Sequence, residues 1–133
     1  MKDIFTGKVV SITGASSGIG EALVKAFASG GSRVIASSND STGLARVAGE
    51  CSGLRGSVIA VPFDLSDTSG IDELAREVMQ KEGRIDMLLN IGGISQRALL
   101  KETPLWLDRK IMEINYFGTI ALTKAVLPHM LAD

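Results

Sequence analysis

A short glycine-rich stretch constrains this 133-residue chain more than any other part of its sequence. Residues 8–20 read KVVSITGASSGIG, in which an apolar, β-branched run leads through Gly14, Gly18 and Gly20 into a helical pattern. A strand that turns into a helix in this way gathers unpaired backbone N–H groups and the positive end of the helix dipole at one point. That point suits a phosphate group. The same glycines would also fit a tight turn that binds nothing, but the flanking strand and helix favour the phosphate.

Strands and helices are expected to alternate along the rest of the chain. Four apolar runs read as strands, at residues 9–12, 33–38, 57–61 and 86–90. The last helix is long: Thr103 is expected to cap it, Pro104 to occupy its first turn, and Pro128 to kink or end it. Its apolar residues spread around much of its circumference, which predicts burial on more than one side. We therefore expect a single α/β domain over residues 1–133, with a parallel sheet covered by helices on both faces.

Composition excludes several other classes of protein. The chain has 14 basic and 15 acidic residues and a formal net charge of −1, so no nucleic-acid partner is expected. The single cysteine, Cys51, excludes an internal disulfide and is consistent with a reducing, intracellular compartment. No apolar stretch approaches the ~20 residues of a membrane span. This form is expected to be soluble, a longer, membrane-associated form is left open, and no cluster has the spacing of a metal site.

Four motifs occur in a characteristic order: TGASSGIG at residues 13–20, Asp64-Leu65, Asn90-Ile91-Gly92-Gly93, and Asn115 in the long helix. This set resembles the short-chain dehydrogenase/reductase family over essentially the whole chain. Residues 92–124 are similar to one branch, the animal reductases of the family-member-7 type, which are linked to lipid, steroid and retinoid carbonyls. The resemblance implies a three-layer, doubly wound Rossmann-type sheet of strand order 3-2-1-4. It also implies that the chain is truncated after the fourth strand and its long helix.

The resemblance assigns cofactor contacts to the loops at the carboxyl edge of the sheet. Asp64 would accept from the adenine amino group beside the Leu65 backbone, although a turn residue would look the same. Asn90 would tie the fourth strand to the first, next to an Ile91 that stands where relatives usually carry asparagine. The expected cofactor-binding residues are Gly14, Ser16, Ser17, Gly18, Ile19, Gly20, Ser38, Asn39, Asp64, Leu65, Asn90 and Gly92.

The choice between the two nicotinamide dinucleotides depends on charge at the end of the second strand. An acid there binds the ribose 2′-hydroxyl and repels a 2′-phosphate, whereas an arginine favours the phosphate. Ser38 stands where an NAD-binding protein would carry the acid, and Asn39 where relatives often carry arginine. Their hydroxyl and amide groups tolerate a phosphate, so we predict NADP as the cofactor, with NAD left open. Asp40 opposes this prediction unless its carboxylate faces away.

Asn115 is the one residue of catalytic type. In the family this asparagine lies in a local break of the long helix and holds a water in a proton relay; its plainer interpretation is a satisfied buried amide. The family's acid/base pair is a Tyr-x-x-x-Lys motif. Here the one tyrosine, Tyr116, is followed four residues later by Ile120.

These observations predict the cofactor-binding half of an oxidoreductase that interconverts small carbonyl and alcohol substrates. The chain alone is expected to be inactive, and to self-associate through the long helix or the open sheet edge. The alternative is a non-catalytic dinucleotide-binding module that acts as a sensor or partner subunit.

Overall fold

Four parallel strands form one sheet in the computed structural model, which describes residues 4–132. The strands are β1 (Val9–Thr13), β2 (Arg33–Ser37), β3 (Ser57–Ala60) and β4 (Met87–Leu89). Their order is β3-β2-β1-β4, as predicted. In register, Val10 of β1 lies opposite Val34 of β2 on one side and Met87 of β4 on the other. The carboxyl ends of all four strands therefore meet at one edge of the sheet.

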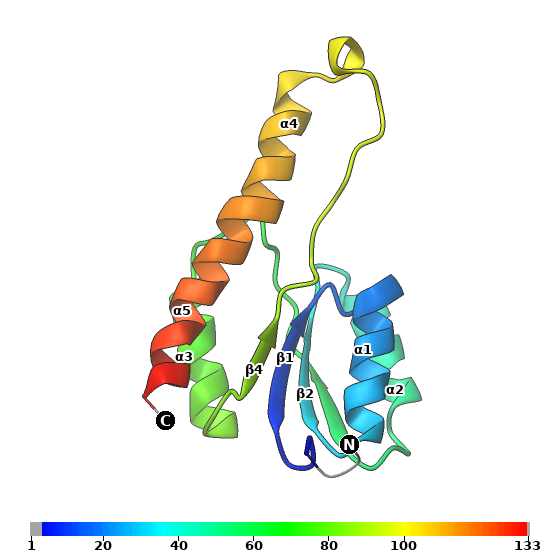
Figure 1. Ribbon diagram of the computed structural model, residues 1–133, viewed down its shortest axis with the longest axis vertical. Helices are drawn as coiled ribbons and strands as arrows, with labels where there is room; N and C mark the ends of the chain where they lie inside the picture. The colour runs from blue at the N-terminus through cyan, green and yellow to red at the C-terminus, as the bar shows by residue number, and fades with distance from the viewer. Residues whose placement is uncertain (1–3, 133) are drawn as a thin grey trace.

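Helices cover both faces of this sheet (Figure 1). On one face lie α1 (Gly18–Ser29) and α2 (Ser41–Glu50), and on the other lie α3 (Ile71–Glu82) and α5 (Thr119–Leu131). A 3₁₀ turn, η1 (Leu100–Glu102), is followed by α4 (Leu105–Met112) and by a π-helical segment, η2 (Glu113–Gly118). The last three helical segments, α4, η2 and α5, form one continuous rod. The predicted three-layer α/β architecture is confirmed.

The α1/α2 side of the sheet holds the better-buried core. Its cluster includes Ile12 of β1, Val24 of α1 and Leu44 of α2, all of which are completely buried. A second cluster joins α3 to α5 through residues such as Ile71, Ala75, Leu122 and Val126. Because the β-branched residues of β1 are buried on both faces, this strand is the centre around which both helical layers pack.

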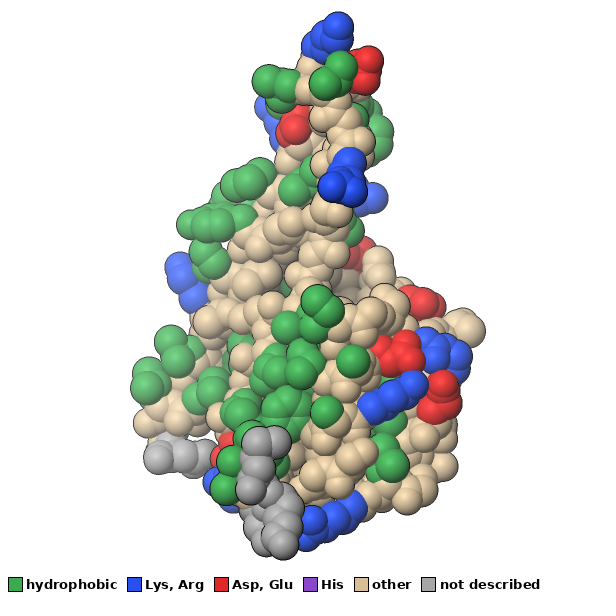
Figure 2. Space-filling view, turned by 45° about the vertical axis from the view of Figure 1, so that its right-hand side comes forward, with side chains coloured by type: hydrophobic (Ala, Val, Ile, Leu, Met, Phe, Trp, Pro, Cys, Tyr) green, Lys and Arg blue, Asp and Glu red, His purple; other side chains and the backbone are tan. Residues whose placement is uncertain are grey.

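Above the carboxyl edge, residues 95–112 form a projecting arm, which contains the rising loop, η1 and α4 (Figure 1). Helix α4 buries none of its residues, and the exposed fraction of Leu100 reaches 86%. The prediction that the long helix is buried on more than one side is therefore wrong for its upper part. Figure 2 shows this narrow part of the molecule carrying hydrophobic and charged side chains on its surface.

The two ends of the long helix also differ from expectation. Pro104, not Thr103, occupies the N-cap position, and the Thr103 hydroxyl donates to the Leu99 carbonyl (3.0 Å). Helix α5 continues through Pro128 to Leu131, so Pro128 does not end it. The missing N–H of Pro128 leaves the Lys124 carbonyl without its helical partner, but Lys124 is exposed and water can satisfy that carbonyl.

Candidate functional site

The glycine-rich turn at the end of β1 lies at one side of an open cleft along the carboxyl edge. Gly14 has φ of +64°, and an added Cβ there would lie 2.9 Å from the Gly92 Cα. At Gly20 an added Cβ would lie 1.9 Å from the Gly14 carbonyl oxygen. These two glycines let β1, α1 and the loop after β4 approach closely. The cleft is lined by Thr13, Gly14, Ser37, Ser38, Asn39, Phe63, Asp64, Leu65, Gly92, Gly93, Ile94 and Ile114.

The start of α1 forms the exposed mouth of this turn. Gly18 has φ of +54°, and nothing lies within 4 Å of an added Cβ. Ser17 occupies the N-cap position, but its hydroxyl makes no capping bond. Ile19 follows with 71% of its surface exposed. The first N–H groups of α1 have no partner within the helix, so the mouth can receive an anion.

Ser16 and Ser38 join the glycine-rich turn to the end of β2. Their hydroxyl oxygens lie 2.8 Å apart, and Ser38 Oγ also accepts from the Asp40 N–H (3.0 Å). The Asp40 carboxylate accepts from the Gly43 N–H (3.0 Å) and caps α2. It is therefore held against the start of α2. Ser38 and Asn39 remain at the lining of the cleft.

Asp64 and Leu65 also line the cleft. Asp64 Oδ1 accepts from both the backbone N–H (2.8 Å) and the hydroxyl (2.7 Å) of Ser66, which makes a local turn. The interpretation of Asp64 as a turn residue therefore holds for one of its two carboxylate oxygens, Oδ1. Leu65 is held tightly, because an added Cβ at Gly92 would lie 2.8 Å from its Cδ1 and one at Gly118 would lie 2.2 Å from its carbonyl oxygen.

The link between β1 and the loop after β4 comes from Thr13 rather than from Asn90. Thr13 Oγ1 accepts from the backbone N–H groups of Ile91 (3.1 Å) and Gly92 (2.9 Å). Asn90 instead donates to Thr123 Oγ1 (3.1 Å) and so ties β4 to α5. The expectation that Asn90 joins the two strands is wrong. No local sequence pattern around Thr13 signals this contact, because its two partners lie 78 and 79 residues further along the chain.

Asn115 lies in η2, so the local break in the long helix that the resemblance implied is present. Its Oδ1 accepts from the Ile94 N–H (2.8 Å), and its Nδ2 donates to the Ile94 carbonyl (2.7 Å). The residue is exposed, not buried. Both ends of the amide thus hold the loop after β4 against the long helix. This places Asn115 beside the cleft, whose lining includes Ile94 and Ile114.

A charged cluster behind the glycine-rich turn was not expected from the sequence. Arg46 on α2 contacts Glu21 on α1 at 2.7 Å, and Lys25 Nζ lies 2.7 Å from the same carboxylate. Hydrogen bonds from Arg46, and then from Lys25, lower the pKa of Glu21 to about 2. Lys25 lies four residues after Glu21 on the same helix, a spacing that the sequence shows directly. Arg46 lies 25 residues after Glu21, and no local sequence pattern indicates that pair.

These features define a Rossmann-type α/β protein with a glycine-rich turn at the carboxyl edge of its sheet. A family model described as short chain dehydrogenase matches residues 8–133, and the chain belongs to this family. It is 43% identical to human dehydrogenase/reductase SDR family member 7 over 130 residues. It is 44% identical over 131 residues to the dehydrogenase/reductase SDR family protein 7-like of Anopheles gambiae. The alignments cover 95% of this chain but only 38% and 41% of those proteins.

Solved structures agree with this assignment. L-sorbose reductase from Gluconobacter frateurii, complexed with NADPH and L-sorbose, has a TM-score of 0.90 and 26% sequence identity. The match covers 99% of this chain and 51% of that chain. A short-chain type dehydrogenase/reductase from Mycobacterium marinum gives a TM-score of 0.90 at 27% identity, and covers 98% and 53%. Within residues 4–132, no helix is both long enough and apolar enough to cross a bilayer.

Proposed function

We propose that this chain forms the cofactor-binding part of an NADP(H)-dependent short-chain oxidoreductase. The observation that carries the proposal is the arrangement after β2: the Asp40 carboxylate is held by the Gly43 N–H, while Ser38 and Asn39 line the cleft. The end of β2 therefore directs hydroxyl and amide groups toward the ligand instead of a carboxylate, which suits a 2′-phosphate. The NADPH in the related L-sorbose reductase structure supports the same choice.

The residues of this chain would bind and orient the dinucleotide. The exposed turn from Ser16 to Ile19 would receive the pyrophosphate, and Asp64 with Leu65 would meet the adenine. Asn90 and Gly92 would lie near the ribose on the nicotinamide side. When bound, the nicotinamide supplies or accepts the hydride in a carbonyl/alcohol interconversion. The branch resemblance points to lipid, steroid or retinoid-like carbonyls as the substrate class.

Calorimetric titration with NADPH and NADH tests this proposal. We expect NADPH to bind more tightly, and Ser38→Asp to weaken NADPH binding about tenfold or more, because like charges close together are unfavourable. Ser52→Asp, which adds the same charge on an exposed turn after α2, is the matched control and should leave both affinities unchanged. Equal affinities in the parent chain would refute the NADP preference. Binding of neither nucleotide would refute the proposal.

We also propose that the 133-residue polypeptide does not reduce carbonyl compounds by itself. Its one tyrosine, Tyr116, lies in η2 with 50% of its surface exposed and has Ile120 where the family motif places lysine. No phenol with a lysine partner is therefore available to protonate the developing alkoxide. NADPH absorbance should stay constant in the presence of a panel of ketones and aldehydes. Turnover by the purified polypeptide would contradict this proposal.

Self-association follows from two surfaces. Within the described residues, β4 pairs with β1 along one side and with no strand along the other. Met112, Tyr116 and Phe117 are each about half exposed along α4 and η2. Open strand edges and apolar patches of this kind promote association. Sedimentation velocity should show a concentration-dependent increase in mass, reduced in Phe117→Glu; a monomer at every concentration would contradict this.

A further inference from the structure

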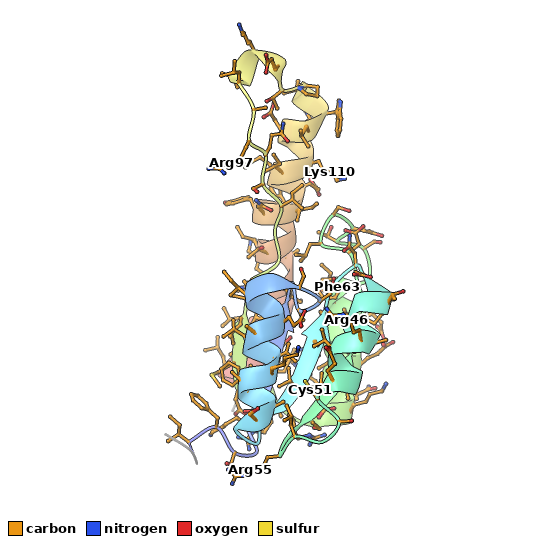
Figure 3. All side chains as sticks on the ribbon, turned by 90° about the vertical axis from the view of Figure 1, so that its right-hand side faces the viewer. Arg46, Cys51, Arg55, Phe63, Arg97 and Lys110 are labelled. Atoms are coloured by element: carbon orange, nitrogen blue, oxygen red, sulfur yellow. The ribbon has the colours of Figure 1, made fainter. Side chains whose placement is uncertain are left out.

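Arg46 connects α2 to both α1 and the glycine-rich turn. Its Nη2 donates to the Ser16 carbonyl (3.1 Å) and to Glu21 Oε1 (2.7 Å), and its Nη1 donates to Glu21 Oε2 (3.2 Å). The same Nη1 donates to the Glu50 carboxylate at 3.0 and 3.2 Å. Figure 3 shows Arg46 extending from α2 into the space between the two helices. One guanidinium thus holds three partners on different parts of the site.

The contact with Ser16 fixes a peptide group inside the phosphate turn. Because a trans peptide is planar, a carbonyl held toward Arg46 directs the following N–H, that of Ser17, the opposite way. Ser16 is also bound through its hydroxyl to Ser38. An added Cβ at Gly43 would lie only 3.0 Å from Ser16 Cβ, so α2 packs directly against this side of the turn. Contacts with α2 therefore hold the conformation of the glycine-rich turn.

The charges of this cluster cancel. Arg46 and Lys25 contribute two positive charges, and Glu21 and Glu50 two negative ones, with contacts of 2.7 to 3.6 Å between them. Both terminal nitrogens of Arg46 are engaged by carboxylates and the Ser16 carbonyl. The cluster has no excess positive charge with which to attract a phosphate. Its effect on a bound anion must therefore act through the backbone that it holds.

We infer that Arg46 is a positioning residue of the dinucleotide site, which holds the glycine-rich turn in its phosphate-receiving conformation without touching the cofactor. This inference rests on the proposed function. The inference predicts how affinity changes. Because the pyrophosphate is common to both dinucleotides, loss of Arg46 must weaken the binding of NADPH and of NADH by the same factor. A residue that touched the 2′-phosphate would affect NADPH alone.

The test compares Arg46→Gln with Glu50→Gln by calorimetry and by amide hydrogen exchange of residues 15–18. Glu50→Gln removes one partner of Arg46 but leaves its contacts with Ser16 and Glu21. We expect Arg46→Gln to weaken both nucleotides about fivefold to tenfold, as for the loss of a charged hydrogen bond. Exchange in the turn should become faster while α1 and β1 stay protected. Glu50→Gln should change affinity less than about twofold. Arg46→Lys, which keeps the charge but loses the fork, should give an intermediate result.

Four outcomes would overturn the inference. A loss confined to NADPH would mean that Arg46 meets the 2′-phosphate directly. Unchanged affinities and exchange in Arg46→Gln would mean that the cluster only supports the packing of α1 on α2. Equal losses of nucleotide affinity in Arg46→Gln and Glu50→Gln would also mean that the cluster only supports helix packing. If Arg46→Gln does not fold, Arg46→Lys decides by the same criteria. If the parent chain binds neither nucleotide, the proposed function fails, and unchanged exchange in the turn would then reject this inference separately.

Discussion

The two halves of the candidate site are held in different ways. The glycine-rich turn lies between β1 and α1, where Ile12 and Val24 are completely buried and the backbones at Gly14 and Gly20 leave no room for a Cβ. The projecting arm instead leaves α4 without a buried residue, and Asn115 joins its base to the loop after β4 by two hydrogen bonds. The dense core therefore fixes the glycine-rich turn, whereas two hydrogen bonds hold Asn115 against the loop after β4. Four experiments can break or sharpen this contrast.

Gly20→Ala should have the largest effect. The added methyl group would meet the Gly14 carbonyl at 1.9 Å, so the backbone of the turn must move. We expect the free energy of unfolding to fall by about 4 kcal/mol, in the range of severe core changes. Gly49→Ala on α2, where nothing lies within 4 Å, is the control and should stabilise the chain by about 0.5 kcal/mol. Urea denaturation measures both; equal small effects would contradict close packing at the turn.

A matched pair of leucines compares the two regions directly. Leu44 of α2 is completely buried, whereas Leu100 of the arm is 86% exposed. Leu44→Ala should lower the free energy of unfolding by about 3 kcal/mol through lost burial and a cavity. Leu100→Ala should change it by less than about 0.5 kcal/mol. Similar losses in the two variants, measured by denaturant midpoints at constant slope, would show that the arm is packed in solution.

Asn115→Ala tests the attachment at the base of the arm. The substitution removes both hydrogen bonds to Ile94. Each bond contributes about 1 kcal/mol net, so global stability should fall by about 1 to 2 kcal/mol. Amide exchange should accelerate at Ile94 and its neighbours while β1 stays protected. Asn90→Ala, which loses only the bond to Thr123, is the control; faster exchange in that variant instead would reverse the assignment.

The smallest effect concerns how the free energy of unfolding depends on pH near the glycine-rich turn. Glu21 faces Arg46 and Lys25, whose hydrogen bonds lower its pKa to about 2 from an ordinary 4.5. A lowered pKa means that the ionised carboxylate stabilises the fold fully above pH 4.5, and that this stabilisation is lost as pH falls from about 4.5 through 2. The stability difference between the parent chain and Glu21→Gln should therefore shrink over that window. A difference independent of pH in denaturant titrations would contradict this.

The sequence predicted the fold well because the strands carry their own signal. Apolar, β-branched runs are typical of buried parallel strands, and the glycine spacing located the turn between β1 and α1. It predicted neither the exposure of the arm nor the roles of Thr13 and Arg46. Exposure depends on which elements lie nearby, and α4 has none beside most of its length. Thr13 and Arg46 act on groups 78 and 30 residues away, beyond any local pattern.

Helix boundaries show the same limit on a smaller scale. Thr103 has the side chain of a cap, yet it bonds back to Leu99, which belongs to the preceding turn. Pro128 was expected to kink or end the helix, and it does not end it, because the carbonyl that it leaves unpaired belongs to an exposed residue. In both cases the residue type has the expected tendency, but the helix boundary is set by which other partners its polar groups find.

The π-helical segment Glu113–Gly118 has a further consequence for the long helix. A wider turn accommodates one extra residue, which rotates everything that follows by roughly 100° relative to an uninterrupted α-helix. The side chains of α5 therefore face a different direction relative to α4 from the one that an uninterrupted α-helix would give them. Deleting one residue between 113 and 118 would let this segment close into an ordinary α-helix and would change the direction of Asn115 relative to Ile94, its partner in two hydrogen bonds. The length of the segment, to a single residue, thus sets which way the long helix presents its amide to the loop after β4.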